Sequence, residues 1–87
     1  MTTDDQLYDL AKTIAHRRGL TLADLRGTRR TRPLVDARAE FAHAGHALGA
    51  SYPQLGRIMD KDHSTMILAA RRWGKEIRVI IYLTHRR

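Results

Sequence analysis

The sequence predicts an all-α fold, a small bundle of about five to six helices that contains a helix-turn-helix. Apolar residues recur at intervals of three and four along successive segments, as they do on the inward face of a helix. Gly19, Gly27 and Gly49 each follow such a segment, where glycine commonly ends a helix. Two of the segments are separated only by residues 60 and 61, a spacing typical of a helix-turn-helix. The 87 residues suffice for one small domain, residues 1–87, with one modest core.

Two helices are expected at the N-terminal end. Thr3 and Gln6 form a capping-box pattern, which predicts a helix that runs to about residue 18. Its inward face should consist of Leu7, Leu10, Ala11 and Ile14. Thr21 begins a second, short helix over Leu22 to about Arg26, and Gly27 ends it.

The densest basic run follows at Thr28–Arg32, with the sequence TRRTR. A charge run is usually a solvated surface. This one lies between two apolar-periodic segments, so we expect the fold to hold it in place. Arginines on such a loop can bind phosphates or enter a narrow minor groove. We therefore predict DNA contacts for Arg29, Arg30 and Arg32.

The most regular apolar stripe begins after Pro33, which suits the start of a helix. It consists of Leu34, Ala37, Phe41, Ala44 and Leu48, and predicts the central core helix. Arg38 and His46 lie off this stripe and could face DNA. His43 and His46 are three residues apart, but a metal site would need more ligands than these two.

The helix-turn-helix is expected at residues 51–72. Ser51 offers an N-cap oxygen and Gln54 follows three residues later. The chain should break at Asp60-Lys61 and resume as a helix at or just before Asp62. The inward face of that second helix should carry Met66, Ala70, Trp73 and Ile77.

The start of the second helix indicates DNA. His63, Ser64 and Thr65 occupy the N-terminal end, where a recognition helix presents side chains to base edges. Asp62 could cap the helix or accept a hydrogen bond from a cytosine amino group. The alternative is that residues 62–65 are an N-cap with solvated neighbours and no DNA role.

Composition narrows the function class. The formal net charge of +7 favours a polyanionic partner, with nucleic acid ahead of an anionic membrane. No window resembles a membrane span or signal peptide, so we expect a soluble, cytoplasmic, nucleoid-associated protein. The absence of cysteine excludes disulfides and thiolate metal sites. Histidines and acids are scattered without a matched acid–base pair, so neither an enzyme nor a cofactor is expected.

The tail at residues 74–87 allows several structures. Gly74 could interrupt the recognition helix or pack closely within it. The run RVIIYL suits a helical face but also has the composition of a strand. We expect a buried last helix. The alternative is an interface, in which the apolar stretch at 77–83 contacts another protein or a second copy of the chain.

From about residue 10 to residue 72, the sequence resembles the C-terminal duplex-DNA-binding domain of the bacterial replication initiator DnaA. The resemblance lies in ADLRGTRRTRPLVDARAEFA and SYPQLGRIMDKDHSTMILAARR, which combine a basic loop, the Pro53–Gly56 step and the DHST motif. It implies an all-helical fold whose DHST helix enters the major groove while the basic loop reaches the minor groove. The residues that it places at DNA, together with neighbouring cations, are Arg29, Arg30, Arg32, Arg38, Tyr52, Pro53, Lys61, Asp62, His63, Ser64, Thr65 and Arg71.

Several positions depart from the family pattern. An Arg-Pro pair is replaced by Asp36 and Ala37, and a turn glycine by Asp60. Other family residues are replaced by Ala39, His46 and Leu68. The docking mode should carry over, whereas the preferred DNA sequence need not. The chain also has no G-x-x-x-x-G-K-[ST] phosphate loop, so we do not expect a complete ATP-driven initiator.

The leading functional prediction is a sequence-specific double-stranded DNA-binding protein that regulates transcription, or the DNA-binding part of such a regulator. The first alternative is replication control at initiator-like boxes. An alternative of another class is a helical protein-interaction module, to which the apolar tail would belong.

Overall fold

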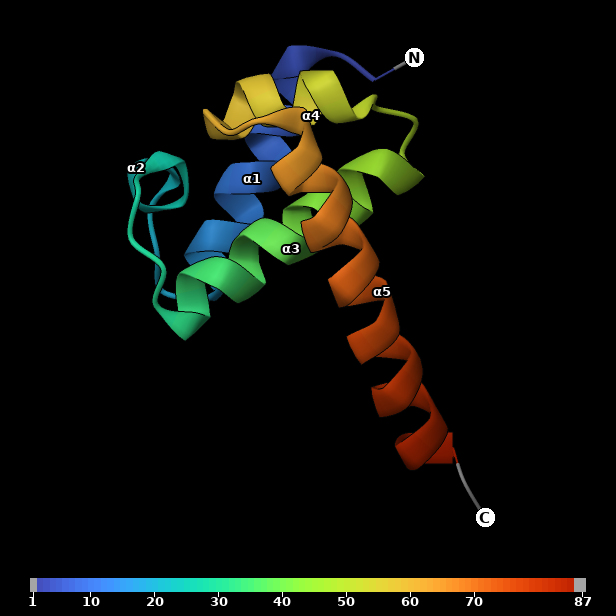
Figure 1. The fold of residues 1–87 in the computed structure, drawn as a ribbon. Coiled ribbons are helices and arrows are strands. Elements are labelled where there is room, and N and C mark those ends of the chain that lie inside the picture. Colours follow the sequence, from blue (N-terminus) through green and yellow to red (C-terminus); the bar gives the residue numbers. More distant parts are fainter. Residues whose placement is uncertain (1, 86–87) are drawn as a thin grey trace.

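A computed structural model describes the backbone of residues 2–85 and the side chains of residues 2–77. The predicted all-α fold is confirmed, with no strand among the described residues (Figure 1). The described residues form five helices. In chain order they are α1 (Asp4–Arg17), α2 (Leu22–Arg26), α3 (Arg32–Ala47), α4 (Tyr52–Met59) and α5 (His63–His85).

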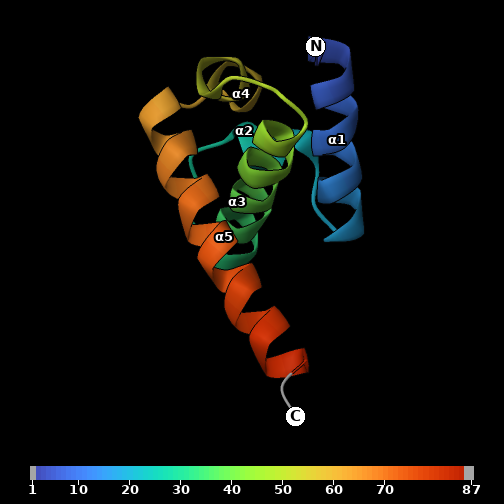
Figure 2. The same ribbon diagram turned by 90° about the vertical axis from the view of Figure 1, so that its right-hand side faces the viewer.

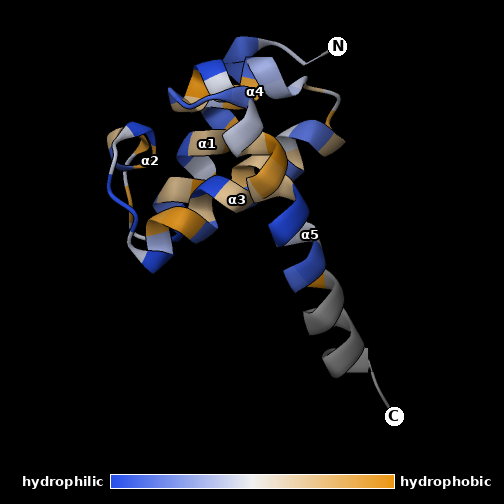
Figure 3. Ribbon diagram, in the orientation of Figure 1, coloured by the Kyte–Doolittle hydropathy of each residue, from blue (hydrophilic) through white to orange (hydrophobic). Residues whose placement is uncertain are grey.

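Helix α3 is the centre of the bundle. It contacts all four other helices and lies between α1 and α5 (Figure 2). Helix α4 crosses one end of this layer and packs on α1, α3 and α5. Hydrophobic residues are concentrated where these helices meet (Figure 3). The helix predicted to be central is therefore central.

The core largely follows the apolar stripes. Phe41 is fully buried, and so are Leu7, Leu55 and Met66 from three other helices. Leu48 does not follow the prediction, because its side chain is 60% exposed. Helix α3 ends at Ala47, so Leu48 lies just beyond the helix and the helical spacing that predicted its burial no longer applies.

Local capping accounts for the helix starts. Thr3 and Thr21 each accept a hydrogen bond from the backbone three residues on, and both capping boxes are complete. Ser51 accepts one from the Gln54 backbone N–H, at 3.2 Å. Such caps satisfy backbone donors that have no partner within the helix.

The turn between α4 and α5 is very tight. Asp60 adopts a left-handed conformation with a φ of 56°, and the Lys61 N–H donates to the Gly56 carbonyl at 2.8 Å. A Cβ added at Gly56 would lie 2.5 Å from the Lys61 carbonyl oxygen. Only glycine allows this approach of α4 to the turn.

Helix α5 runs without interruption through Gly74 to His85, and its second half extends away from the bundle (Figure 1). The prediction of a helix for the tail is therefore confirmed, and the strand alternative is wrong. Whether the tail is buried or forms an interface depends on side chains from residue 78 onward, which lie outside the described residues.

Candidate nucleic-acid interface

The first turn of α5 presents polar side chains to solvent. Asp62, His63, Ser64 and Thr65 are all exposed, whereas Met66 is fully buried and anchors the turn in the core. His63 Nδ1 lies 3.4 Å from an Asp62 carboxylate oxygen. The four DHST side chains thus lie together at the start of a fixed helix, with their polar atoms available to a partner.

The same exposed face continues along α5. With about 3.6 residues per turn, the residues at intervals of three and four from Ser64 lie on one side of the helix. Those described as exposed on this outer face are Leu68, Arg71, Arg72 and Lys75. The opposite side carries buried Met66 and Ala70. The outer face of α5 is therefore basic, with one apolar residue in its middle.

The basic loop, residues 27–31, is held from inside by Arg38. The Arg38 residue is only 7% exposed. Its guanidinium donates to four backbone carbonyl oxygens, those of Asp24 (3.1 Å), Leu25 (2.7 Å), Gly27 (3.0 Å) and Arg29 (2.6 Å). A planar group with five fixed donors is suited to gather several carbonyls in this way.

Lys61, in the turn before α5, holds the same segment from the other side. Its Nζ donates to the carbonyl oxygens of Arg26 (3.0 Å), Gly27 (2.6 Å) and Met59 (3.3 Å). An ammonium group has three protons, so these three acceptors use all of them. The basic loop and the helix-turn-helix are thereby joined directly.

Both internal cations have a lowered pKa. For Arg38 the main cause is burial, followed by repulsion from Arg30. For Lys61 the main cause is again burial, followed by repulsion from Arg38, while nearby Asp60 opposes the shift. Burial of these two positive charges costs electrostatic free energy. The hydrogen bonds to carbonyl oxygens offset that cost.

Arg38 and Lys61, both predicted to contact DNA, line the loop-side hollow, and their donor groups are bound to backbone carbonyl oxygens. The acceptors lie at the C-terminal ends of α2 and α4 and in the loop, where backbone carbonyls lack the partner that a continuing helix would supply. The two side chains support the interface from behind.

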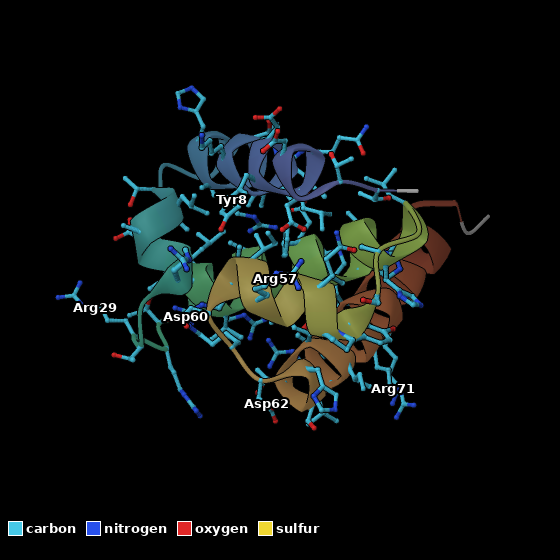
Figure 4. The ribbon with its side chains drawn as sticks, turned by 90° about the horizontal axis from the view of Figure 1, so that it is seen from above. Tyr8, Arg29, Arg57, Asp60, Asp62 and Arg71 are labelled. Atoms are coloured by element: carbon cyan, nitrogen blue, oxygen red, sulfur yellow. The ribbon has the colours of Figure 1, made fainter. Side chains whose placement is uncertain are left out.

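The remaining arginines of the basic run are exposed. Arg29 points outward at the edge of the molecule, with only its carbonyl bound to Arg38 (Figure 4). Arg30 is exposed as well. Arg32 begins α3, and its guanidinium pairs with Asp36 at 3.1 Å and Glu76 at 3.6 Å. That pairing raises the pKa of Arg32, with the Asp36 hydrogen bond as the first cause.

Two hollows flank the outer face of α5. The loop-side hollow has a volume of about 590 Å³ and lies between α5 and the basic loop. Its lining includes Arg26, Thr28, Arg30, Lys61, Thr65, Leu68 and Arg72. It therefore joins predicted residues of the basic loop to predicted residues of α5 across a single concave surface.

The α4-side hollow lies on the other flank and has a volume of about 360 Å³. Its lining includes His43, His46, Tyr52, Arg71 and Lys75. The rings of His46 and Tyr52 stack with centroids 4.1 Å apart, and His46 Nδ1 lies 3.1 Å from the Ala50 carbonyl oxygen. Pro53, the next residue of α4, is exposed.

Figure 4 shows how these parts lie relative to the bundle. Asp62 and Arg71 lie on the side of the molecule opposite α1, and Arg29 lies at an edge between these two sides. The predicted site residues thus lie on or beside one surface, where Arg38 and Lys61 line the loop-side hollow. We call this surface the α5 face.

Several residues on this surface are not among those predicted from the sequence. Arg26, Thr28 and Arg72 line the loop-side hollow, and Lys75 lines the other. The helical spacing from Ser64 to Arg71 and Lys75 could have indicated the basic outer face. The hollows themselves depend on how α3 and the loop meet α5, and short-range patterns do not reveal this.

No group of three or more histidine, cysteine or acidic side chains among the described residues is placed to hold a metal ion. No helix in the described part combines the length and apolar character needed to cross a membrane.

The sequence of this chain matches a known protein family. The sequence model for the bacterial DnaA protein helix-turn-helix matches residues 8–72, most of the chain. The chain belongs to the bacterial DnaA helix-turn-helix family. The resemblance to DnaA found in the sequence is thereby confirmed, and the matched residues include the basic loop, α4 and the start of α5. The DnaA helix-turn-helix is a double-stranded DNA-binding domain. No curated protein and no solved structure matches the chain.

Proposed function

We propose that this DnaA-family chain binds double-stranded DNA in a sequence-specific manner through the α5 face. The observation that carries the proposal is the fixed spatial relation of the basic loop to the first turn of α5. Lys61 bonds the turn to the carbonyls of residues 26 and 27, and Arg38 gathers the loop from beneath. Two DNA-contacting elements held in one register favour recognition of a defined site over unspecific attraction.

The shape of the α5 face fits a duplex. The major groove of B-DNA admits one α-helix, and side chains near that helix N-terminus reach base edges. His63, Ser64 and Thr65 supply an imidazole and two hydroxyls at that position. Asp62 supplies an acceptor for a cytosine amino group. These four residues are our proposed base-reading set.

The basic loop lies beside α5 across the loop-side hollow. A DNA backbone passing over that hollow would meet Arg72, and the minor groove beyond it would lie within reach of Arg30 on the basic loop. A narrow minor groove attracts inserted arginines because its potential is most negative. We propose Arg30 as the minor-groove arginine. Arg29 and Arg32 act as phosphate contacts.

The second DNA backbone would lie on the other flank of α5. There Tyr52 and Arg71 line the α4-side hollow, and Pro53 is exposed at the first turn of α4. The backbone N–H groups of a helix N-terminus favour a phosphate. These three residues are our proposed backbone contacts on that flank.

For the cellular role, we propose two candidates. DnaA is a replication initiator, so membership of its family favours control of replication at initiator-like boxes. Control of transcription, the leading prediction from the sequence, remains the second candidate. Genome-wide occupancy of the intact protein separates them, because peaks at the origin support the first role and peaks at promoters support the second.

The first test is a fluorescence-anisotropy titration of the intact protein on duplexes chosen by selection from random DNA. We expect a selected site to bind at least tenfold more tightly than random duplex at moderate salt. Equal affinity for both would contradict sequence-specific binding and favour the alternative of a protein-interaction module.

A second test concerns Arg30. Arg30→Ala should weaken binding to all duplexes and lower the slope of log affinity against log salt by about one, because the interface loses one cation that displaces a DNA counterion. The matched control is Arg17→Ala, which removes the same charge from the exposed end of α1, where Arg17 pairs with Glu40. An unchanged slope in Arg30→Ala, or an equal change in both variants, would contradict the role of Arg30.

A further inference from the structure

Leu68 is a large apolar side chain placed in the open on the DNA-facing helix. It is 67% exposed, and Leu48 is the only other large hydrophobic residue described as exposed. One exposed leucine is ordinary on a protein surface. Its position is what matters, because the other side chains of the outer face of α5 are polar or charged.

The position of Leu68 follows from helix geometry. It lies one turn after Ser64 and three residues after Thr65, so it projects from the same side as the proposed base-reading residues. It also lines the loop-side hollow together with Arg30 and Arg72. A duplex that engages Ser64 and Thr65 therefore has Leu68 over the floor of the same groove.

Major-groove chemistry offers one apolar feature to such a side chain. Base edges there present hydrogen-bond donors and acceptors, together with the C5 methyl group of thymine. Leucine has no donor or acceptor, so it cannot form the polar contacts. It can bury a C5 methyl group and gain the corresponding hydrophobic free energy.

We propose that Leu68 is a specificity-determining residue that packs against the C5 methyl group of a pyrimidine in the major groove, about one helical turn from the base read by Ser64. This inference rests on the proposed function of the α5 face. The methyl group can belong to thymine or to 5-methylcytosine, because both carry it at the same ring position.

The test is a coupling experiment on a selected site. Each thymine of the site is replaced, one at a time, by deoxyuridine, which lacks only the C5 methyl group. Intact wild-type protein should lose about fourfold in affinity at one or two positions, the effect of exposing one methyl-sized group. Leu68→Ala should bind the unmodified site more weakly and should show no further loss at those positions.

The control variant is Leu48→Ala, which makes the same substitution at the other exposed leucine, on the C-terminal end of α3. It should keep the wild-type response to deoxyuridine. A second arm compares cytosine with 5-methylcytosine at each C·G pair of the site. Tighter binding of the methylated base by wild type, lost in Leu68→Ala, would assign the contact to 5-methylcytosine.

Three outcomes would overturn the inference. Leu68→Ala could keep the full wild-type penalty for every missing methyl group. No C5 methyl group, of thymine or of cytosine, could matter to the wild-type protein. The variant could also lose affinity equally for selected and random duplex, which would indicate a backbone contact. Failure of the proposed function is distinct, because the wild-type protein would then show no preference for any selected site.

Discussion

Arg38 illustrates how a charged residue near a polyanion can serve structure instead of contact. Its guanidinium lies beneath the basic loop and binds four carbonyl oxygens, so it replaces the hydrogen bonds that the irregular segment cannot make with itself. The positive charge remains close to the surface and still contributes to the field that attracts DNA.

We expect Arg38→Met to destabilise the protein. Methionine fills much of the same space but donates nothing, and carbonyls left without a partner cost about 1–3 kcal/mol each when they are buried. Urea denaturation should show a loss of at least that size, together with weaker DNA binding. Arg32→Met is the control, because Arg32 is exposed and should unfold close to wild type. Equal stability of the two variants would refute the internal role of Arg38.

Sequence reasoning at the residue scale succeeded where a side chain is positioned by periodicity. The buried register of Met66 fixes the exposure of His63, Ser64 and Thr65, and the sequence contains that register. It did not reveal the hydrogen-bond partners of Arg38 and Lys61, because those partners are backbone carbonyls of another segment. Any residue carries a carbonyl, so such a partner leaves no trace in the sequence.

At the element scale, the turn between α4 and α5 decides how the recognition helix is aimed. Gly56 brings the last turns of α4 against the Lys61 carbonyl, and Asp60 reverses the chain in a left-handed conformation. Since Lys61 also binds the basic loop, a shift of this turn would move both of the proposed DNA-contacting elements together.

Gly56→Ala should destabilise the protein by about 1–3 kcal/mol, because its Cβ would collide with backbone that cannot move without disturbing the turn. Thermal or urea unfolding measures the loss. Gly74→Ala is the matched control in α5, where the added Cβ would lie 3.6 Å from the His43 ring, an ordinary contact. There alanine should stabilise by about 0.5–1 kcal/mol. A Gly56→Ala protein as stable as Gly74→Ala would contradict the close approach.

The helices themselves were largely predictable, since their caps are local. Thr3 and Thr21 each have their capping partner three residues later, and α2 spans the predicted residues Leu22–Arg26. Gly74 was ambiguous in the sequence. A glycine costs only about 1 kcal/mol within a helix, so packing against α3 could determine whether α5 continued.

At the scale of the whole molecule, the N-terminal end of α1 is bonded to α4 by residues that are 50 and 53 positions apart in the sequence. The Asp4 carboxylate accepts hydrogen bonds from Gln54 Nε2 at 3.0 Å and from Arg57 at 2.9 Å. These contacts lower the pKa of Asp4, with the Gln54 hydrogen bond as the first cause and Arg57 as the second. No local sequence pattern predicts this pairing, because the two segments meet only in the folded chain.

The lowered pKa of Asp4 implies that the stability of the protein depends on pH. A carboxyl group whose pKa is lower in the folded state contributes stability above its unfolded pKa, about 3.9 for aspartate. That contribution is lost as the pH falls through the folded pKa. Asp4→Asn should therefore be less stable than wild type at neutral pH, and the two proteins should converge in strong acid.

Urea denaturation at a series of pH values measures the difference. Asp5→Asn provides the control, because Asp5 is exposed in the same first turn of α1 and shares its favourable position at the helix N-terminus. The pH-dependent deficit of Asp4→Asn should exceed that of Asp5→Asn. Identical pH profiles for the two variants would show that Gln54 and Arg57 contribute nothing through Asp4.

The continuity of α5 has a mechanical consequence. One helix runs from the proposed base-reading turn at His63 to His85, without a hinge at Gly74. Because α5 is continuous, a reporter fused beyond His85 would be held at a fixed angle around the DNA axis, as well as at a fixed distance from the base-reading turn. Each residue inserted into the helix would turn that reporter by about 100° and displace it by about 1.5 Å.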